Sequence, residues 1–121
     1  MVLEDLQIAV SQGSTGQTIL SLKGPLSIHT LFKFQEAVRS ESSPVVIVDF
    51  GGVPFIDSAG LGALVSAHVS RSKTNRKVVL VGLNKQVRTL IEMTKVHQLF
   101  HSYKTLPEAE AAAQAQMQQS P

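Results

Sequence analysis

The order of apolar and polar positions along the chain predicts short strands that alternate with helices. Two apolar runs, residues 3–10 and 17–23, flank the segment SQGSTG, whose small and polar residues are typical of a hairpin turn. The runs 45–50 (VVIVDF) and 77–82 (KVVLVG) contain many β-branched residues and no polar alternation. Such runs are typical of parallel strands that are covered on both faces.

Between and after these strands, apolar residues recur at the spacing of a helix. Helices are expected over residues 29–40 with Ser27 or Thr30 as cap, from Ala59 to about Lys73, after the N-cap Asn84, and from Pro107 onward. In the second helix, Leu61, Leu64 and His68 are expected on the buried face, whereas Arg71 is expected to face elsewhere. Residues 96–103 should complete the core near a short edge strand.

The element order predicts two overlapping βαβ units that follow an N-terminal hairpin. Right-handed crossovers make the three later strands parallel, and the hairpin makes the first strand antiparallel. We therefore predict one α/β domain at residues 1–113, with a small, mixed, mostly parallel sheet and helices packed on it. A frayed tail is expected at residues 114–121.

In open α/β sheets, partners meet the loops beyond the carboxyl ends of the parallel strands. The topology therefore predicts that four polar side chains share one rim: Ser27, Asp57, Ser58 and Asn84. Ser58 directly precedes the second helix, and we expect its hydroxyl to cap that helix by accepting from the N–H of Gly60 or Leu61. Asp57 is the alternative cap. Ala59 and Gly60 keep the first turn slim, so that a partner can approach.

Composition and charge exclude several classes of protein but do not indicate a specific function. The absence of cysteine excludes disulfides and thiolate zinc sites, and it suits the cytoplasm. The acidic N-terminus is unlike a signal peptide, and the apolar runs are too short to cross a membrane. The net charge is only +2, and the cluster RSKTNRK is better interpreted as a solvated helix end than as a nucleic-acid patch. We expect no cofactor, no nucleic acid and no membrane contact.

A serine hydrolase that uses Ser58 is the enzymatic alternative, and the sequence disfavours it. A nucleophile elbow reads Gly-x-Ser-x-Gly, and Ile56 stands where the first glycine belongs. Among the four histidines, only His97 and His101 have the i, i+4 spacing of helical metal ligands, and no acidic companion lies nearby. We therefore expect no catalytic residue and no metal.

The segment VDFGGVPFIDSAGLGALVSAH resembles the signature of STAS domains, in particular that of the bacterial anti-sigma-factor antagonists. The family pattern is a strand that ends in Asp, a short loop, and then Asp-Ser-x-Gly-Leu-Gly. The similarity continues upstream in LSLKGPLSIHTLFKFQEAV and downstream in VVLVGLNKQVRTLIEMTKVHQLF, so it covers about residues 5–112.

The resemblance implies a binding switch and not an enzyme. In the family, the unphosphorylated antagonist sequesters an anti-sigma factor that is also a serine kinase of the histidine-kinase-like ATPase family. This kinase uses Mg-ATP to phosphorylate the serine that matches Ser58, the phosphoprotein is released, and a PP2C-type phosphatase resets it. The implied partner-binding rim consists of Ser27, Asp57, Ser58, Ala59, Gly60 and Asn84.

Two positions depart from the family pattern. Ser27 stands where the family commonly has an Asp on this rim, an acid that is tied to phosphorylation or kinase contact. Lys95 stands where glycine is common, so either a non-glycine residue takes the helix C-terminal conformation or the helix continues. The first departure leaves open a STAS scaffold without the switch, such as a partner of a lipid-transport ATPase or another signalling module.

Overall fold

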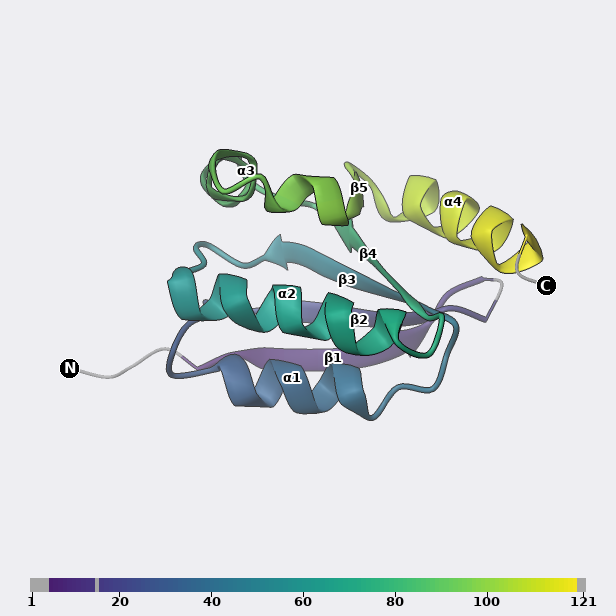
Figure 1. The fold of residues 1–121 in the computed structure, drawn as a ribbon, viewed down its shortest axis with the longest axis horizontal. Helices are drawn as coiled ribbons and strands as arrows, with labels where there is room; N and C mark the ends of the chain where they lie inside the picture. Colours follow the sequence, from purple (N-terminus) through teal and green to yellow (C-terminus); the bar gives the residue numbers. More distant parts are fainter. Residues whose placement is uncertain (1–4, 15, 120–121) are drawn as a thin grey trace.

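The structure follows the predicted alternation of strands and helices. The computed structural model describes residues 5–14 and 16–119 of the 121-residue chain. Its elements are β1 (Gln7–Gln12), β2 (Thr18–Lys23), α1 (Leu31–Arg39), β3 (Val45–Gly52), α2 (Ser58–Ser72), β4 (Lys77–Val81), α3 (Lys85–Met93), the 3-10 helix η1 (Val96–Leu99), β5 (His101–Tyr103) and α4 (Leu106–Gln119) (Figure 1).

One sheet with the order β1-β2-β3-β4-β5 runs through the molecule. β1 pairs antiparallel with β2, and the pairs β2–β3, β3–β4 and β4–β5 are parallel. The predicted mixed, mostly parallel α/β sheet is therefore confirmed, and so is the short edge strand, which is β5. Each parallel pair joins strands whose connection contains a helix, as parallel pairing requires.

Helices cover both faces of this sheet, which explains why the central strands lack polar alternation. Alternate residues of β3 enter two different cores: Val46 and Val48 contact the side of α1, α2 and α3, whereas Val45 and Ile47 contact α4. α1 and α2 lie side by side, and α4 lies apart from them (Figure 1). The core under α1, α2 and α3 is the larger one.

Arg71 is buried, with 4% of its surface exposed, so the prediction that it faces elsewhere is wrong. Its guanidinium donates to three backbone carbonyl oxygens, those of Lys77, Glu41 and Ser43. These carbonyls lie at the amino ends of β3 and β4, where the chain enters the sheet. Burial lowers the pKa of the Arg71 guanidinium. The side chain thus ties the last turn of α2 to two strand entries.

Element boundaries differ from the predictions in a few places. β1 continues to Gln12, into the segment predicted as a turn, and residues 3 and 4 of the predicted strand lie outside the described part. The α4 backbone is helical to Gln119, past the start of the expected tail, while residues 120–121 are not described. Lys95 takes the left-handed conformation, with φ 61°, and α3 ends before it. Across the described residues, we find no helix long and apolar enough to cross a membrane.

Candidate functional site

The loops that follow β2, β3 and β4 meet at one end of the sheet, as the topology predicts. Beyond β2 and β3, backbone pairing continues into the loops: the Gly24 N–H donates to the Gly52 oxygen at 2.9 Å, and the Leu26 N–H donates to the Phe55 oxygen at 3.3 Å. Leu26 also forms an isolated parallel bridge with Ile56. The two loops therefore behave as an extension of the sheet that reaches the start of α2.

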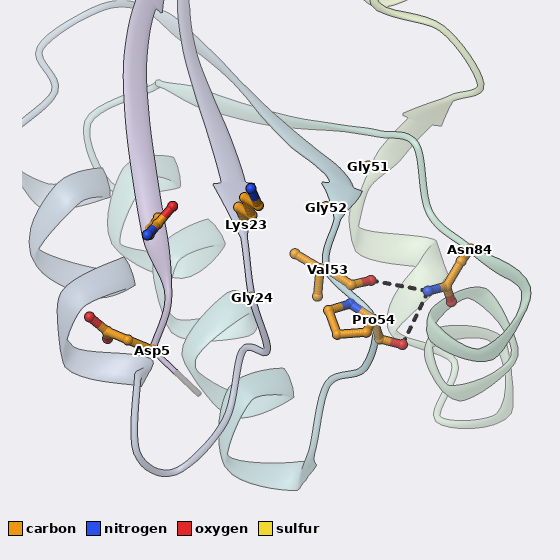
Figure 2. A pocket seen from close by; sticks show the side chains of 9 residues that line it. Asp5, Lys23, Gly24, Gly51, Gly52, Val53, Pro54 and Asn84 are labelled. Atoms are coloured by element: carbon orange, nitrogen blue, oxygen red, sulfur yellow. Dashed lines mark hydrogen bonds between the residues drawn. The ribbon is translucent and has the colours of Figure 1, made fainter. Parts of the chain in front are cut away.

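Asn84 connects the third loop to this pair. Its side-chain oxygen caps α3 by accepting from the Val87 N–H at 2.8 Å, which confirms the predicted N-cap. Its Nδ2 donates to the carbonyl oxygens of Val53 and Pro54 at 3.0 and 3.2 Å (Figure 2). One side chain thus holds the start of α3 against the loop that leads to α2.

An open hollow of about 580 Å³ lies beside Asn84, and Figure 2 shows Lys23 and Asp5 on its other side. Two glycines that line it are required by the fold itself. A Cβ on Gly24 would lie 2.2 Å from the Asp5 carbonyl oxygen, and one on Gly52 would lie 2.6 Å from a β2 carbonyl oxygen. The hollow therefore follows from the close approach of neighbouring backbones.

Asp57, and not Ser58, is the N-cap of α2, so the first choice of cap is wrong and the alternative is correct. Asp57 has the extended backbone of a cap residue, and its Oδ1 accepts from the Gly60 N–H at 2.7 Å. Its Oδ2 accepts from the Ile28 N–H at 3.0 Å. A carboxylate offers a separate oxygen to each donor, so the two bonds need not share one acceptor atom. Asp57 therefore both starts α2 and holds the β2–α1 loop beside it.

The surroundings of the Asp57 carboxyl favour its charged form. Burial raises its pKa, but three backbone N–H groups and a neighbouring imidazole together outweigh this effect and lower the pKa below its ordinary value; these groups belong to Gly60, Ile28, Ala59 and His29. The rim therefore carries a fixed negative charge next to Ser58 at neutral pH.

Ser58 is the first residue of α2, and it is exposed. Within the described part of the chain, its hydroxyl makes no hydrogen bond, because Asp57 takes the capping position. The hydroxyl is therefore free to react or to contact a partner. A phosphate on Ser58 would lie at a helix N-terminus, where backbone N–H groups and the helix dipole favour an anion.

Internal packing leaves no space for a side chain at Gly60. It is buried, and a Cβ at this position would lie 2.1 Å from the Leu26 carbonyl oxygen. The interpretation that Gly60 leaves room for a partner is therefore wrong: it leaves room for the β2–α1 loop. Ala59 is half-buried, so it contributes less to the surface than Ser58 does.

Ser27 lies at this end of the sheet but beneath its surface, with 6% of its surface exposed. Its Oγ accepts from the His29 N–H at 3.2 Å, and its own N–H donates to Oγ1 of Thr30 at 2.9 Å. The Thr30 hydroxyl donates in turn to the Pro25 carbonyl oxygen at 2.8 Å. The two hydroxyls therefore stabilise the turn before α1. Thr30 occupies the N-cap position of α1, as one of the two predicted alternatives, but its hydroxyl makes no capping bond to the helix.

Two exposed apolar residues near Ser58 were not identified as surface residues from the sequence. Ile28, which is 58% exposed, donates its N–H to Asp57, and Phe55, which is 47% exposed, lies three residues before Ser58. Large exposed apolar side chains that gather at one place are typical of protein-binding surfaces. In the sequence, both residues look like core residues. Only their exposure in the folded protein distinguishes them from the core.

The histidines do not form the arrangement that metal binding requires. His97 lies in η1 and His101 begins β5, so their i, i+4 spacing does not place them on one helix face. His68 packs edge-on against Phe100, with ring centroids 5.1 Å apart. Over the part of the chain that the structure describes, no three His, Asp or Glu side chains gather at a possible metal site.

We compared the chain with known protein families and with known proteins. The family model described as "STAS domain" matches residues 8–109. A curated relative, the anti-sigma-B factor antagonist of Listeria monocytogenes, is 27% identical over 93 residues, which cover 74% of this chain and 82% of the relative.

Solved structures with different functions share the fold. A putative anti-sigma factor antagonist from Thermotoga maritima superposes with a TM-score of 0.80 at 23% identity, covering 87% of this chain and 92% of that one. The murine solute carrier 26 family member A9 anion transporter superposes with a TM-score of 0.75 at 21% identity, covering 92% of this chain and 22% of that one. At these identities the likeness shows the fold alone.

Proposed function

Because this chain belongs to the STAS domain family, we propose that it is an anti-sigma factor antagonist whose binding is switched by phosphorylation of Ser58. Its partner is an anti-sigma factor that is also a serine kinase of the histidine-kinase-like ATPase family. The unphosphorylated protein sequesters this kinase in the cytoplasm, and phosphorylation releases it. A PP2C-type phosphatase returns the protein to its binding form. The protein is thus a binding module and not an enzyme.

The observation that carries this proposal is the division of roles between Asp57 and Ser58. The Asp57 carboxylate caps α2 and holds the β2–α1 loop, and among the described residues the exposed Ser58 hydroxyl has no hydrogen-bond partner. A residue that the fold does not need can be modified without loss of structure. The exposed Ile28 and Phe55 beside it offer apolar area for a partner.

Phosphorylation at this position changes the surface more than the fold. A phosphate adds roughly 1.5 to 2 negative charges at pH 7, next to the charge of Asp57. The helix N-terminus favours the anion, so the fold tolerates it. A partner that covers Ser58 and offers no cation there would bury these charges unpaired, which is strongly unfavourable. The partner therefore dissociates.

The test is to incubate the protein with its cognate kinase and Mg-ATP and to measure intact mass. We expect one added phosphate in the wild type and in Ser66→Ala, an exposed serine on the same helix, and none in Ser58→Ala. Because Ser58 is not the cap, Ser58→Ala should change stability by less than about 0.5 kcal/mol and keep partner binding. Ser58→Asp should weaken binding. An active kinase that leaves Ser58 unmodified contradicts the proposal.

A second candidate is a STAS scaffold that binds a partner without phosphorylation. Ser27 favours it, because the buried hydroxyl at this position offers no carboxylate to a kinase. Affinity capture distinguishes the two candidates: recovery of a kinase supports the switch, whereas recovery of a transporter ATPase supports the scaffold.

A further inference from the structure

Gly62 is an exposed glycine inside α2 that the packing of the fold does not require. A Cβ built at this position meets no atom within 4 Å. Its neighbour Gly60 differs, because a Cβ there would lie 2.1 Å from the Leu26 carbonyl oxygen. Glycine within a helix is destabilising relative to alanine. Gly62 therefore lowers the stability of α2, and the packing of the fold does not require a glycine there.

The position of Gly62 relates it to the phosphoacceptor. Gly62 follows Ser58 by four residues, so the two lie on the same face of α2, about 6 Å apart along the axis. Both are exposed. Near Ser58, Ile28 donates its N–H to Asp57, Phe55 lies three residues before Ser58, and both expose about half of their surface. The surface next to Ser58 thus combines bare helix backbone with exposed apolar side chains.

We propose that Gly62 is a contact residue for the kinase-type anti-sigma factor, and that it marks the point where this partner comes closest to α2. The inference rests on the function proposed above. Without a side chain at position 62, the kinase can rest against the helix backbone and bring its bound Mg-ATP to the Ser58 hydroxyl. A side chain would hold the kinase away by its own length.

The transfer that this approach permits is a simple displacement. The Ser58 Oγ forms a bond to the γ-phosphorus of Mg-ATP, the bond from that phosphorus to the β–γ bridging oxygen breaks, and ADP leaves. The hydroxyl proton is released. Such transfers depend mainly on positioning, so a displacement of about 1 Å is enough to slow them strongly.

The test compares Gly62→Ala and Gly62→Gln with the wild type. Both variants should melt a few degrees higher than the wild type, because both residues favour helix more than glycine does. Both should also lose function: we expect Gly62→Gln to lower kinase affinity and the kcat/KM of Ser58 phosphorylation at least tenfold, and Gly62→Ala to lower them less. A gain in stability with a loss of binding excludes misfolding as the cause.

Ser70→Gln is the matched control. Ser70 is exposed on the same helix, about 18 Å along the axis from Ser58, and it receives the same side chain. This variant should bind and be phosphorylated like the wild type. Gly60→Ala gives the opposite contrast, because its Cβ has no space and its melting temperature should fall.

The two proposals fail in different ways. If the wild type neither binds nor is phosphorylated by a purified, active kinase-type anti-sigma factor from the same genome, the proposed function is wrong and this inference falls with it. If the wild type is bound and phosphorylated, and Gly62→Gln matches Ser70→Gln in both measurements, the inference alone is overturned.

Discussion

The substitution Asp57→Asn separates the two hydrogen bonds that the Asp57 carboxylate accepts. One oxygen accepts from Gly60 at 2.7 Å and caps α2, and the other accepts from Ile28 at 3.0 Å and holds the β2–α1 loop. An amide has the same shape but only one acceptor oxygen. The side chain introduced by Asp57→Asn can therefore keep one bond, whereas Asp57→Ala loses both.

The expected magnitudes follow from these two bonds. Loss of a side-chain N-cap costs about 1 kcal/mol, and asparagine is as good a cap as aspartate. A hydrogen bond on the protein surface contributes about 1 kcal/mol. Asp57→Asn should therefore lower the free energy of unfolding by about 1 kcal/mol through the loss of the bond to Ile28. Asp57→Ala should lower it by about 2 kcal/mol.

Urea unfolding at pH 7 measures these differences, and amide hydrogen exchange assigns them to a bond. In Asp57→Asn we expect the Ile28 amide to exchange faster while the Gly60 amide keeps its protection. In Asp57→Ala both amides should exchange faster. Equal destabilisation by the two substitutions, or unchanged exchange at both amides in Asp57→Asn, would refute the reasoning.

The same pair of proteins gives a pH test. Folding lowers the pKa of the Asp57 carboxyl from 3.8, so its contribution to stability is complete above that value and is lost as pH falls through the folded-state pKa. The advantage of the wild type over Asp57→Asn should be present at pH 7 and shrink below about pH 4. A constant advantage at low pH would contradict this assignment.

Two further predictions concern residues outside the rim. Arg71→Met removes the donor of three backbone carbonyls and should cost about 2 to 4 kcal/mol in urea unfolding; a cost below about 1 kcal/mol would show that water replaces the guanidinium. Lys95→Gly places glycine at φ 61° and should raise the free energy of unfolding by about 0.5 to 1 kcal/mol, so a lower melting temperature would contradict the strain argument.

The sheet was predictable because burial on both faces leaves a direct mark on the sequence. The runs 45–50 and 77–82 are largely apolar since successive residues enter different cores, and a strand with one face in water would show polar alternation instead. Arg71 was not predictable, because side-chain type alone places arginine at the surface. Its burial depends on three carbonyls that only the folded chain brings together.

At the rim, the sequence contains the right residues but does not distinguish their roles. Asp57 and Ser58 are both good N-caps, and the choice depends on the Ile28 N–H, which comes from a distant loop and needs an acceptor. Gly60 and Gly62 are the same residue two positions apart. Only the Leu26 carbonyl, which faces one of them, shows that the first serves the fold and the second does not.

The division of roles between Asp57 and Ser58 determines how a switch at Ser58 can work. If Ser58 were the cap, phosphorylation would replace the acceptor that starts α2, and stability and partner binding would change together. Because Asp57 holds both N–H groups, a phosphate on Ser58 leaves those bonds in place. Stability and binding can then vary independently. Under the proposed function, the phosphorylated form would stay folded, and a phosphatase could recognise it and return it to the binding state.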